Sequence, residues 1–131
     1  MSLFSSLSRF FKEHPVDNLT FDWNGEPIQF ADWPHDAYGS YQYTTRNRRH
    51  HFEFDLEPVD GEVRIYITKQ PSYRGRRSGG HPTHRKGLEH GKPYVCIDDG
   101  LEPDNVPDAL SWLIYWAENT GDYIDTGKEF T

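Results

Sequence analysis

The feature that most constrains the fold of this 131-residue chain is an alternation of apolar and polar residues on both sides of one tight turn. Residues 52–57 read FEFDLE and residues 62–68 read EVRIYIT, with Asp60-Gly61 between them. A period of two is typical of strands that bury one face. Asp-Gly is a strong signal for a two-residue hairpin turn. The two runs therefore predict an antiparallel hairpin whose apolar face needs a covering layer.

Further strands are predicted on both sides of this hairpin. Residues 19–23 alternate in the same way, and Asn24-Gly25 then predicts a turn into a return strand at 28–30. Residues 41–43 place two tyrosines on one face of another strand, and residues 93–97, which read PYVCI, predict a short apolar strand. Together these segments indicate an antiparallel meander.

Two helices are predicted, one near each end of the chain. Residues 2–13 place leucines and phenylalanines at helical spacing, and Pro15 ends that helix because proline disfavours helical geometry in the residue before it. The second helix begins after Asn105, which resembles an N-cap residue, with an acid three positions later. It is predicted to end at Gly121. Both helices are apolar enough to cover the sheet, and Trp112 and Trp116 are predicted to belong to the buried surface of the second one.

The segment 70–92 holds five glycines and two prolines, so it is predicted to be an irregular, flexible loop. The predicted fold class is therefore α+β, in a single domain over residues 1–131. It comprises an N-terminal helix, an antiparallel meander of four to five strands, a long His-Pro loop, a short strand and a C-terminal helix. Aromatic residues make up 15% of the chain, which predicts a core built on large rings.

Charge and cysteine content exclude several classes of protein. The formal net charge of -7 argues against nucleic-acid binding by the whole surface. One cysteine cannot form an internal disulfide. No apolar run approaches the roughly 18 residues of a membrane span, and the N-terminus lacks a signal-peptide pattern. We expect a soluble cytoplasmic protein with no cofactor and no membrane partner.

Charge is also distributed unevenly along the chain. The stretch from Lys69 to Lys92 holds seven of the fourteen lysines and arginines and only one acid, whereas nine acids and one lysine follow from Asp98 onward. Two interpretations of this distribution are open: solvated loops of mixed sign, or two docking patches for partners of opposite charge.

Three short motifs follow one another in the second half of the chain: VRIYITK at residues 63–69, His81-Pro82-Thr83, and Cys96-Ile97-Asp98 with a predicted helix after it. They resemble, in that order, the last meander strand, the His-Pro-Asn motif and the active-site cysteine motif of the ubiquitin-conjugating enzyme (UBC) family, and in particular of its minimal bacterial members. The resemblance implies a UBC fold and a transferase. Thr83 stands where the family has asparagine.

The resemblance also implies partners and site residues. Cys96 would accept a ubiquitin-like protein from a ubiquitin-activating-like enzyme as a thioester and pass it to a lysine of a target protein. In the bacterial relatives antiviral defence is a setting for such chemistry. A thiol reacts readily with an activated acyl group, but transfer to an amine also needs an oxyanion donor and a proton acceptor. The candidate donors are His81, Thr83, His84 and His90, and the candidates for orienting or deprotonating the lysine are Asp98 and Asp99.

Each of these residues has a structural alternative. Cys96 in an apolar strand is equally typical of an inert core residue. In the structural alternative, His81 does no more than begin a tight turn before Pro82, and Asp98 and Asp99 form a solvated turn.

Three other functions are consistent with the same residues. One is a non-catalytic scaffold with the same fold. The second is a zinc site built from His81, His84, His90 and Cys96, although their spacing matches no common zinc motif. The third is a nucleic-acid-binding module, which the net acidity disfavours. Its residues would be Arg74, Arg76, Arg77, Arg85 and Lys86 with Tyr73 and Tyr94.

Overall fold

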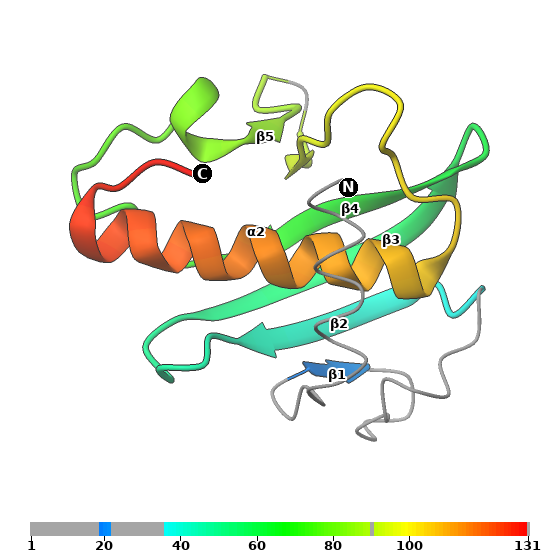
Figure 1. The fold of residues 1–131 in the computed structure, drawn as a ribbon, viewed down its shortest axis with the longest axis horizontal. Helices are drawn as coiled ribbons and strands as arrows, with labels where there is room; N and C mark the ends of the chain where they lie inside the picture. The colour runs from blue at the N-terminus through cyan, green and yellow to red at the C-terminus, as the bar shows by residue number, and fades with distance from the viewer. Residues whose placement is uncertain (1–18, 22–35, 90, 131) are drawn as a thin grey trace.

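The computed structural model describes residues 19–21, 36–89 and 91–130. Within these ranges, six antiparallel strands form one sheet and one long helix lies across a single face of it (Figure 1). The α+β class is therefore confirmed. The spatial order of the strands is β1-β2-β3-β4-β6-β5. The elements are β1 (Leu19–Phe21), β2 (Gly39–Thr44), β3 (His51–Val59), β4 (Glu62–Lys69), the 3-10 turn η2 (His81–Thr83), β5 (Arg85–Lys86), β6 (Tyr94–Val95) and the helix α2 (Val106–Thr126).

The predicted central hairpin is confirmed as β3 and β4. Leu56 pairs with Ile65 and Phe54 with Ile67, so the apolar residues of both strands share one face. Gly61 turns the chain with φ at 82°, a left-handed conformation that glycine adopts at little cost. The hairpin was predictable because its pattern and its turn are both local.

The helix α2 begins where the sequence predicts but ends later. Asn105 caps it by accepting the Asp108 amide hydrogen at 3.0 Å. The predicted end at Gly121 is wrong, because α2 continues to Thr126 and is capped by Gly127, which has φ at 78°. Gly121 is buried, and a Cβ there would lie only 3.0 Å from Cδ2 of His50. The glycine at 121 therefore allows close packing and does not end the helix.

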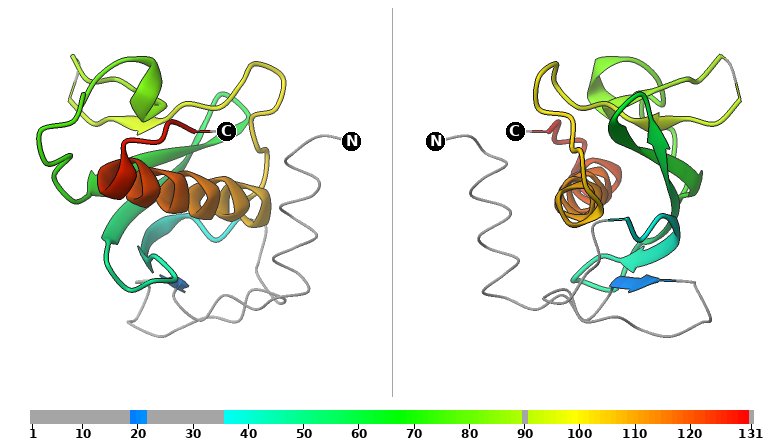
Figure 2. Two further views of the ribbon diagram at one scale, coloured as in Figure 1. Left: turned by 60° about the vertical axis from the view of Figure 1, so that its left-hand side comes forward. Right: turned by 90° about the vertical axis from the view of Figure 1, so that its right-hand side faces the viewer.

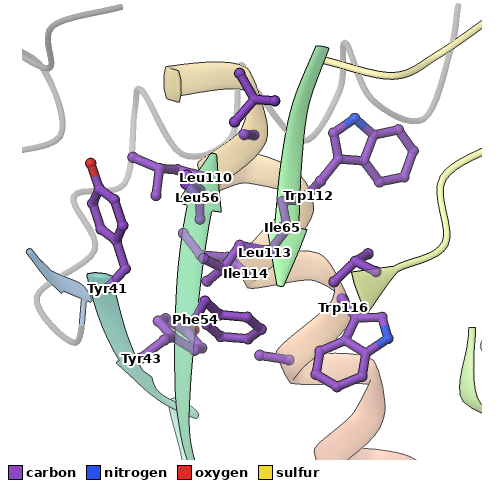
Figure 3. Close-up of a cluster of buried hydrophobic side chains, with 14 of the residues drawn as sticks. Tyr41, Tyr43, Phe54, Leu56, Ile65, Leu110, Trp112, Leu113, Ile114 and Trp116 are labelled. Carbon is purple, nitrogen blue, oxygen red and sulfur yellow. The ribbon is translucent and has the colours of Figure 1, made fainter. Parts of the chain in front are cut away.

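The core lies between α2 and the inner face of the sheet, as Figures 2 and 3 show. The ring of Trp116 makes edge-to-face contacts with Phe52 and Phe54, at centroid distances of 5.6 and 5.9 Å. Trp112 and Trp116 are both buried, as predicted. Fully buried partners include Tyr41, Tyr43, Leu56, Ile65, Leu110, Leu113 and Ile114. Aromatic rings thus supply much of the buried area.

Several predicted segments lie outside the described residues. These are the helix at 2–13 and the return strand at 28–30, and of the first predicted strand only β1 is described, paired with β2. The segment 70–92 is not wholly irregular, because it contains η2 and β5; its flexibility stays a prediction. No helix in the described ranges is long and apolar enough to cross a membrane.

Candidate functional site

Cys96 directly follows β6 and is partly exposed to solvent. Its backbone N–H donates to the carbonyl of His84 at 2.8 Å, which ties it to the residue after η2. Val95, immediately before it, is only 5% exposed, so exposure changes within one residue along the strand. The cysteine therefore directly follows a two-residue strand whose last residue is buried, and it is not sealed in the core.

Beyond Tyr94 the chain leaves the side of β4. The Ile67 N–H donates to the Pro93 carbonyl at 2.8 Å, but the Val63 N–H donates to Pro103, further along the loop. A cavity of about 240 Å³ lies where the two segments separate. Its lining includes apolar side chains from both neighbours of Cys96, namely Val95 and Ile97, and charged ones from Arg64, Lys86, Glu62 and Glu102.

Thr83 is 1% exposed and is held from both sides. Its hydroxyl donates to the Gly80 carbonyl at 3.0 Å, and its own carbonyl accepts from Nε1 of Trp116 at 3.0 Å. The hydroxyl hydrogen is thus already used within the turn. Thr83 anchors η2 on α2, which is a structural role.

His84 has a left-handed backbone conformation, with φ at 47°. Its ring stacks on Phe130, with centroids 4.4 Å apart and planes 21° apart. Phe130 in turn packs against the main core and contacts Tyr115, so the C-terminal tail folds back as its apolar residues suggest. The imidazole of His84 therefore forms part of the surface on which the C-terminal tail packs.

The side chains of His81 and His90 lie outside what the structure describes, so two members of the hypothetical zinc set are not placed. Among described residues, no group of three or more histidine, cysteine, aspartate or glutamate side chains is arranged to hold a metal ion.

Asp98 and Asp99 are exposed on the turn that follows Cys96. The Asp98 carbonyl accepts the Leu101 amide hydrogen at 3.0 Å, which closes the turn. Burial, and then the negative charge of Asp98, raise the pKa of Tyr115 on α2. The Asp98 carboxylate is therefore close enough to α2 for its charge to act on the Tyr115 hydroxyl.

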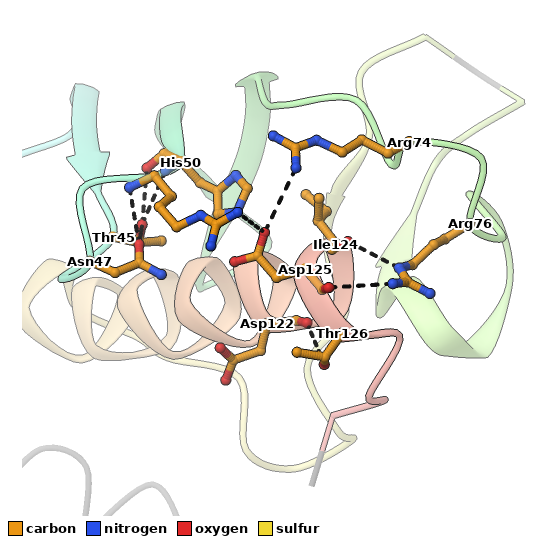
Figure 4. A network of polar contacts seen from close by, with 10 residues as sticks. Thr45, Asn47, His50, Arg74, Arg76, Asp122, Ile124, Asp125 and Thr126 are labelled. Atoms are coloured by element: carbon orange, nitrogen blue, oxygen red, sulfur yellow. Dashed lines mark hydrogen bonds and ion pairs between the residues drawn. The ribbon is translucent and has the colours of Figure 1, made fainter.

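The first part of the His-Pro loop is attached to the C-terminal end of α2 (Figure 4). Nε of Arg76 donates to the Ile124 carbonyl at 3.0 Å, and the Tyr123 hydroxyl donates to the Arg77 carbonyl at 2.8 Å. Arg85 donates within the loop, to Gln70 Oε1 and to the Ser78 carbonyl. Several cations of the hypothetical nucleic-acid site are thus used to hold the loop together.

The residue that sequence reasoning missed is Asp125. Its Oδ1 lies 2.9 Å from Nε2 of His50, whose side chain is 1% exposed, and 3.5 and 4.0 Å from nitrogens of Arg49 and Arg74 (Figure 4). One carboxylate thus joins the β2–β3 turn, the His-Pro loop and the last turn of α2. The basic turn at 46–49 hinted at an acidic partner, but nothing local identified one 75 positions away.

No family model, no curated protein and no solved structure matches this chain.

Proposed function

We propose that the protein is a ubiquitin-conjugating-enzyme-like carrier of a ubiquitin-like protein. Cys96 accepts the modifier from an activating enzyme as a thioester and passes it to a lysine of a target. The observation that carries the proposal is the position of Cys96, partly exposed at the end of β6 and bonded through its amide to His84. The order of meander, His-Pro turn, cysteine and helix supports it.

The first step is an exchange between two thiols. The Cys96 thiolate attacks the carbonyl carbon of the thioester on the activating enzyme. A new C–S bond forms, the old one breaks, and the thiol of the activating enzyme leaves as a thiolate that takes up a proton. No electrons are lost or gained, and little besides an accessible sulfur is required.

The second step is the attack of an amine on that thioester. The lysine ammonium loses one proton to a base before it attacks and a second as the C–N bond forms, the C–S bond breaks, and the departing Cys96 thiolate takes up a proton. Asp98 and Asp99, two and three residues beyond the thiol and exposed, suit a partner for the ammonium group. Because the Thr83 hydroxyl donates to Gly80, we assign Thr83 to positioning the turn, and His81, His84 and His90 remain the candidate oxyanion donors.

The test is a charging reaction with a cognate activating enzyme, its ubiquitin-like protein and ATP. We expect a band on a non-reducing gel that reducing agent removes and that Cys96→Ala abolishes, whereas Cys96→Ser gives an oxyester that survives reduction. Asp98→Asn with Asp99→Asn should still charge but should discharge more slowly to free lysine. A charged band that persists in Cys96→Ala would refute the proposal.

A non-catalytic scaffold is the second candidate. It is favoured by the fact that Thr83 and His84 both direct their side chains into contacts within the protein. The two candidates differ in the reactivity of the thiol. If the protein is a carrier, Cys96 should react with a thiol reagent at close to its rate in the denatured protein. Strong protection of Cys96 in the folded protein, together with no adduct from a verified set of partners, would favour the non-catalytic scaffold.

A further inference from the structure

The outer face of the sheet, opposite α2, carries a row of two aromatic rings and two cations. The alternation along β4 buries Val63, Ile65 and Ile67 under α2 and turns the residues between them outward. The rings of Tyr66 and Tyr94 meet edge to face at 6.0 Å. The Arg64 guanidinium lies 4.4 Å from the centre of the Tyr94 ring, and Nζ of Lys92 lies 5.5 Å from the centre of the Tyr66 ring.

These four residues line an open hollow of about 460 Å³, together with Glu57 and Gly87. Gly87 has φ at 79°, and a Cβ there would lie 2.9 Å from the Lys92 carbonyl and 3.3 Å from the Tyr94 ring. A larger residue would therefore press on the ring that forms the wall of the hollow. The glycine keeps this side of the hollow open.

The two cations of the hollow form no ion pair with the described part of the chain. No carboxylate among the described residues lies within 4.0 Å of Arg64 or Lys92. Glu57 is opposite Arg64 in the strand register but forms no such ion pair. In a protein with a net charge of -7, two cations held against half-buried rings retain their capacity for charge-assisted hydrogen bonds to an anion.

We propose that this hollow binds an acidic peptide segment of a partner protein. Carboxylates of the segment pair with Arg64 and Lys92, and the aliphatic parts of the segment lie on the rings of Tyr66 and Tyr94. Such a segment is complementary to the site because its carboxylates can pair with the two cations, which outnumber Glu57, and its aliphatic surface can cover the two rings.

A peptide fits this face better than a nucleic acid does. Strand β3 places Glu53, Asp55 and Glu57 on the same outer side, since they alternate with its buried residues. A phosphate backbone that continued past the two cations would meet these carboxylates. A short peptide needs only the two cations. Tyr94 of the hollow lies two residues before Cys96, but the inference does not depend on the thioester proposal.

The experiment measures fluorescence anisotropy of a fluorescein-labelled peptide of alternating glutamate and leucine, titrated with the full chain at about 0.1 M salt. A lysine–leucine peptide and a labelled oligothymidylate serve as comparison probes. The test variant is Arg64→Gln with Lys92→Gln. Its charge-matched control is Arg77→Gln with Lys128→Gln, two exposed cations outside the hollow. Equal urea midpoints for the variants establish that both fold.

We expect the acidic peptide to bind the natural chain and the control alike, and to bind the test variant roughly tenfold or more weakly. Binding should be unchanged in Cys96→Ala, which separates this result from any failure of thioester formation. The proposal is overturned if the peptide does not bind, if both double variants weaken it equally, or if oligothymidylate binds more tightly through Arg64 and Lys92, which would make the hollow a nucleic-acid site.

Discussion

Removal of the Asp125 carboxylate should destabilise the fold through one buried partner. A carboxylate oxygen can only accept hydrogen bonds, so the 2.9 Å contact requires that Nε2 of His50 carries the hydrogen. In Asp125→Ala that donor stays buried without its partner, which costs about 1–3 kcal/mol. Arg49 and Arg74 are 58% and 57% exposed, so each adds under about 1 kcal/mol. The expected loss in the free energy of unfolding is about 2–3 kcal/mol.

A second substitution at the same position separates the hydrogen bond from the charge. In Asp125→Asn the amide oxygen can still accept from His50, so the loss should be about 1 kcal/mol or less. Asp122→Ala removes an exposed acid from the same helix and should change stability by less than about 0.5 kcal/mol. Urea unfolding followed by circular dichroism gives all three values, provided that the denaturant slope is unchanged.

The reasoning about Asp125 is refuted by either of two results. If Asp125→Ala costs less than about 1 kcal/mol, His50 finds another acceptor or water reaches it. If Asp125→Asn costs as much as Asp125→Ala, the ion pairs with the exposed arginines outweigh the buried hydrogen bond, contrary to the usual weakness of such pairs.

Three further changes test other parts of the structure. Burial raises the pKa of Glu118, so the protonated side chain stabilises the fold below the ordinary pKa of glutamate, and this stabilisation is lost as the pH rises through the raised pKa. Glu118→Gln should therefore be more stable than the natural chain at pH 7 and equally stable in acid. Urea unfolding at a series of pH values measures the difference. Gly87→Ala, with its positive φ and a backbone carbonyl 2.9 Å away, should cost roughly 1–3 kcal/mol in thermal unfolding. Trp116→Phe leaves the buried Thr83 carbonyl without its donor and should cost about 1–3 kcal/mol, with faster amide exchange around η2 as the local sign.

Local patterns predicted the elements, whereas contacts between distant residues decided the rest. The β3–β4 hairpin and the start of α2 follow from alternation, from Asp60-Gly61 and from the Asn105 cap, all of which act within a few residues. The predicted end of α2 was wrong because Gly121 makes room for the ring of His50, which is distant in sequence, and does not cap the helix.

The candidate site shows the same division. The sequence identified Cys96 as the one thiol but could not give its exposure, which depends on how soon β6 ends and where the loop leaves β4. It also identified Thr83 as a hydroxyl in the motif. It could not show that the hydroxyl of Thr83 donates to Gly80 or that its carbonyl accepts from Trp116. Residue types are visible in a sequence, whereas the partners that use up their hydrogen bonds are not.

The 21 residues of α2 span roughly 30 Å, and each end is joined to a different side of the segment that surrounds the thiol. The loop that carries Cys96 leads into the first turn of α2, and the side chain of Arg76 donates a hydrogen bond to its last turn. Fraying of the last turn of α2 would consequently release two distant segments together: the first part of the His-Pro loop, which Arg76 attaches to it, and the β2–β3 turn, which Asp125 attaches through His50.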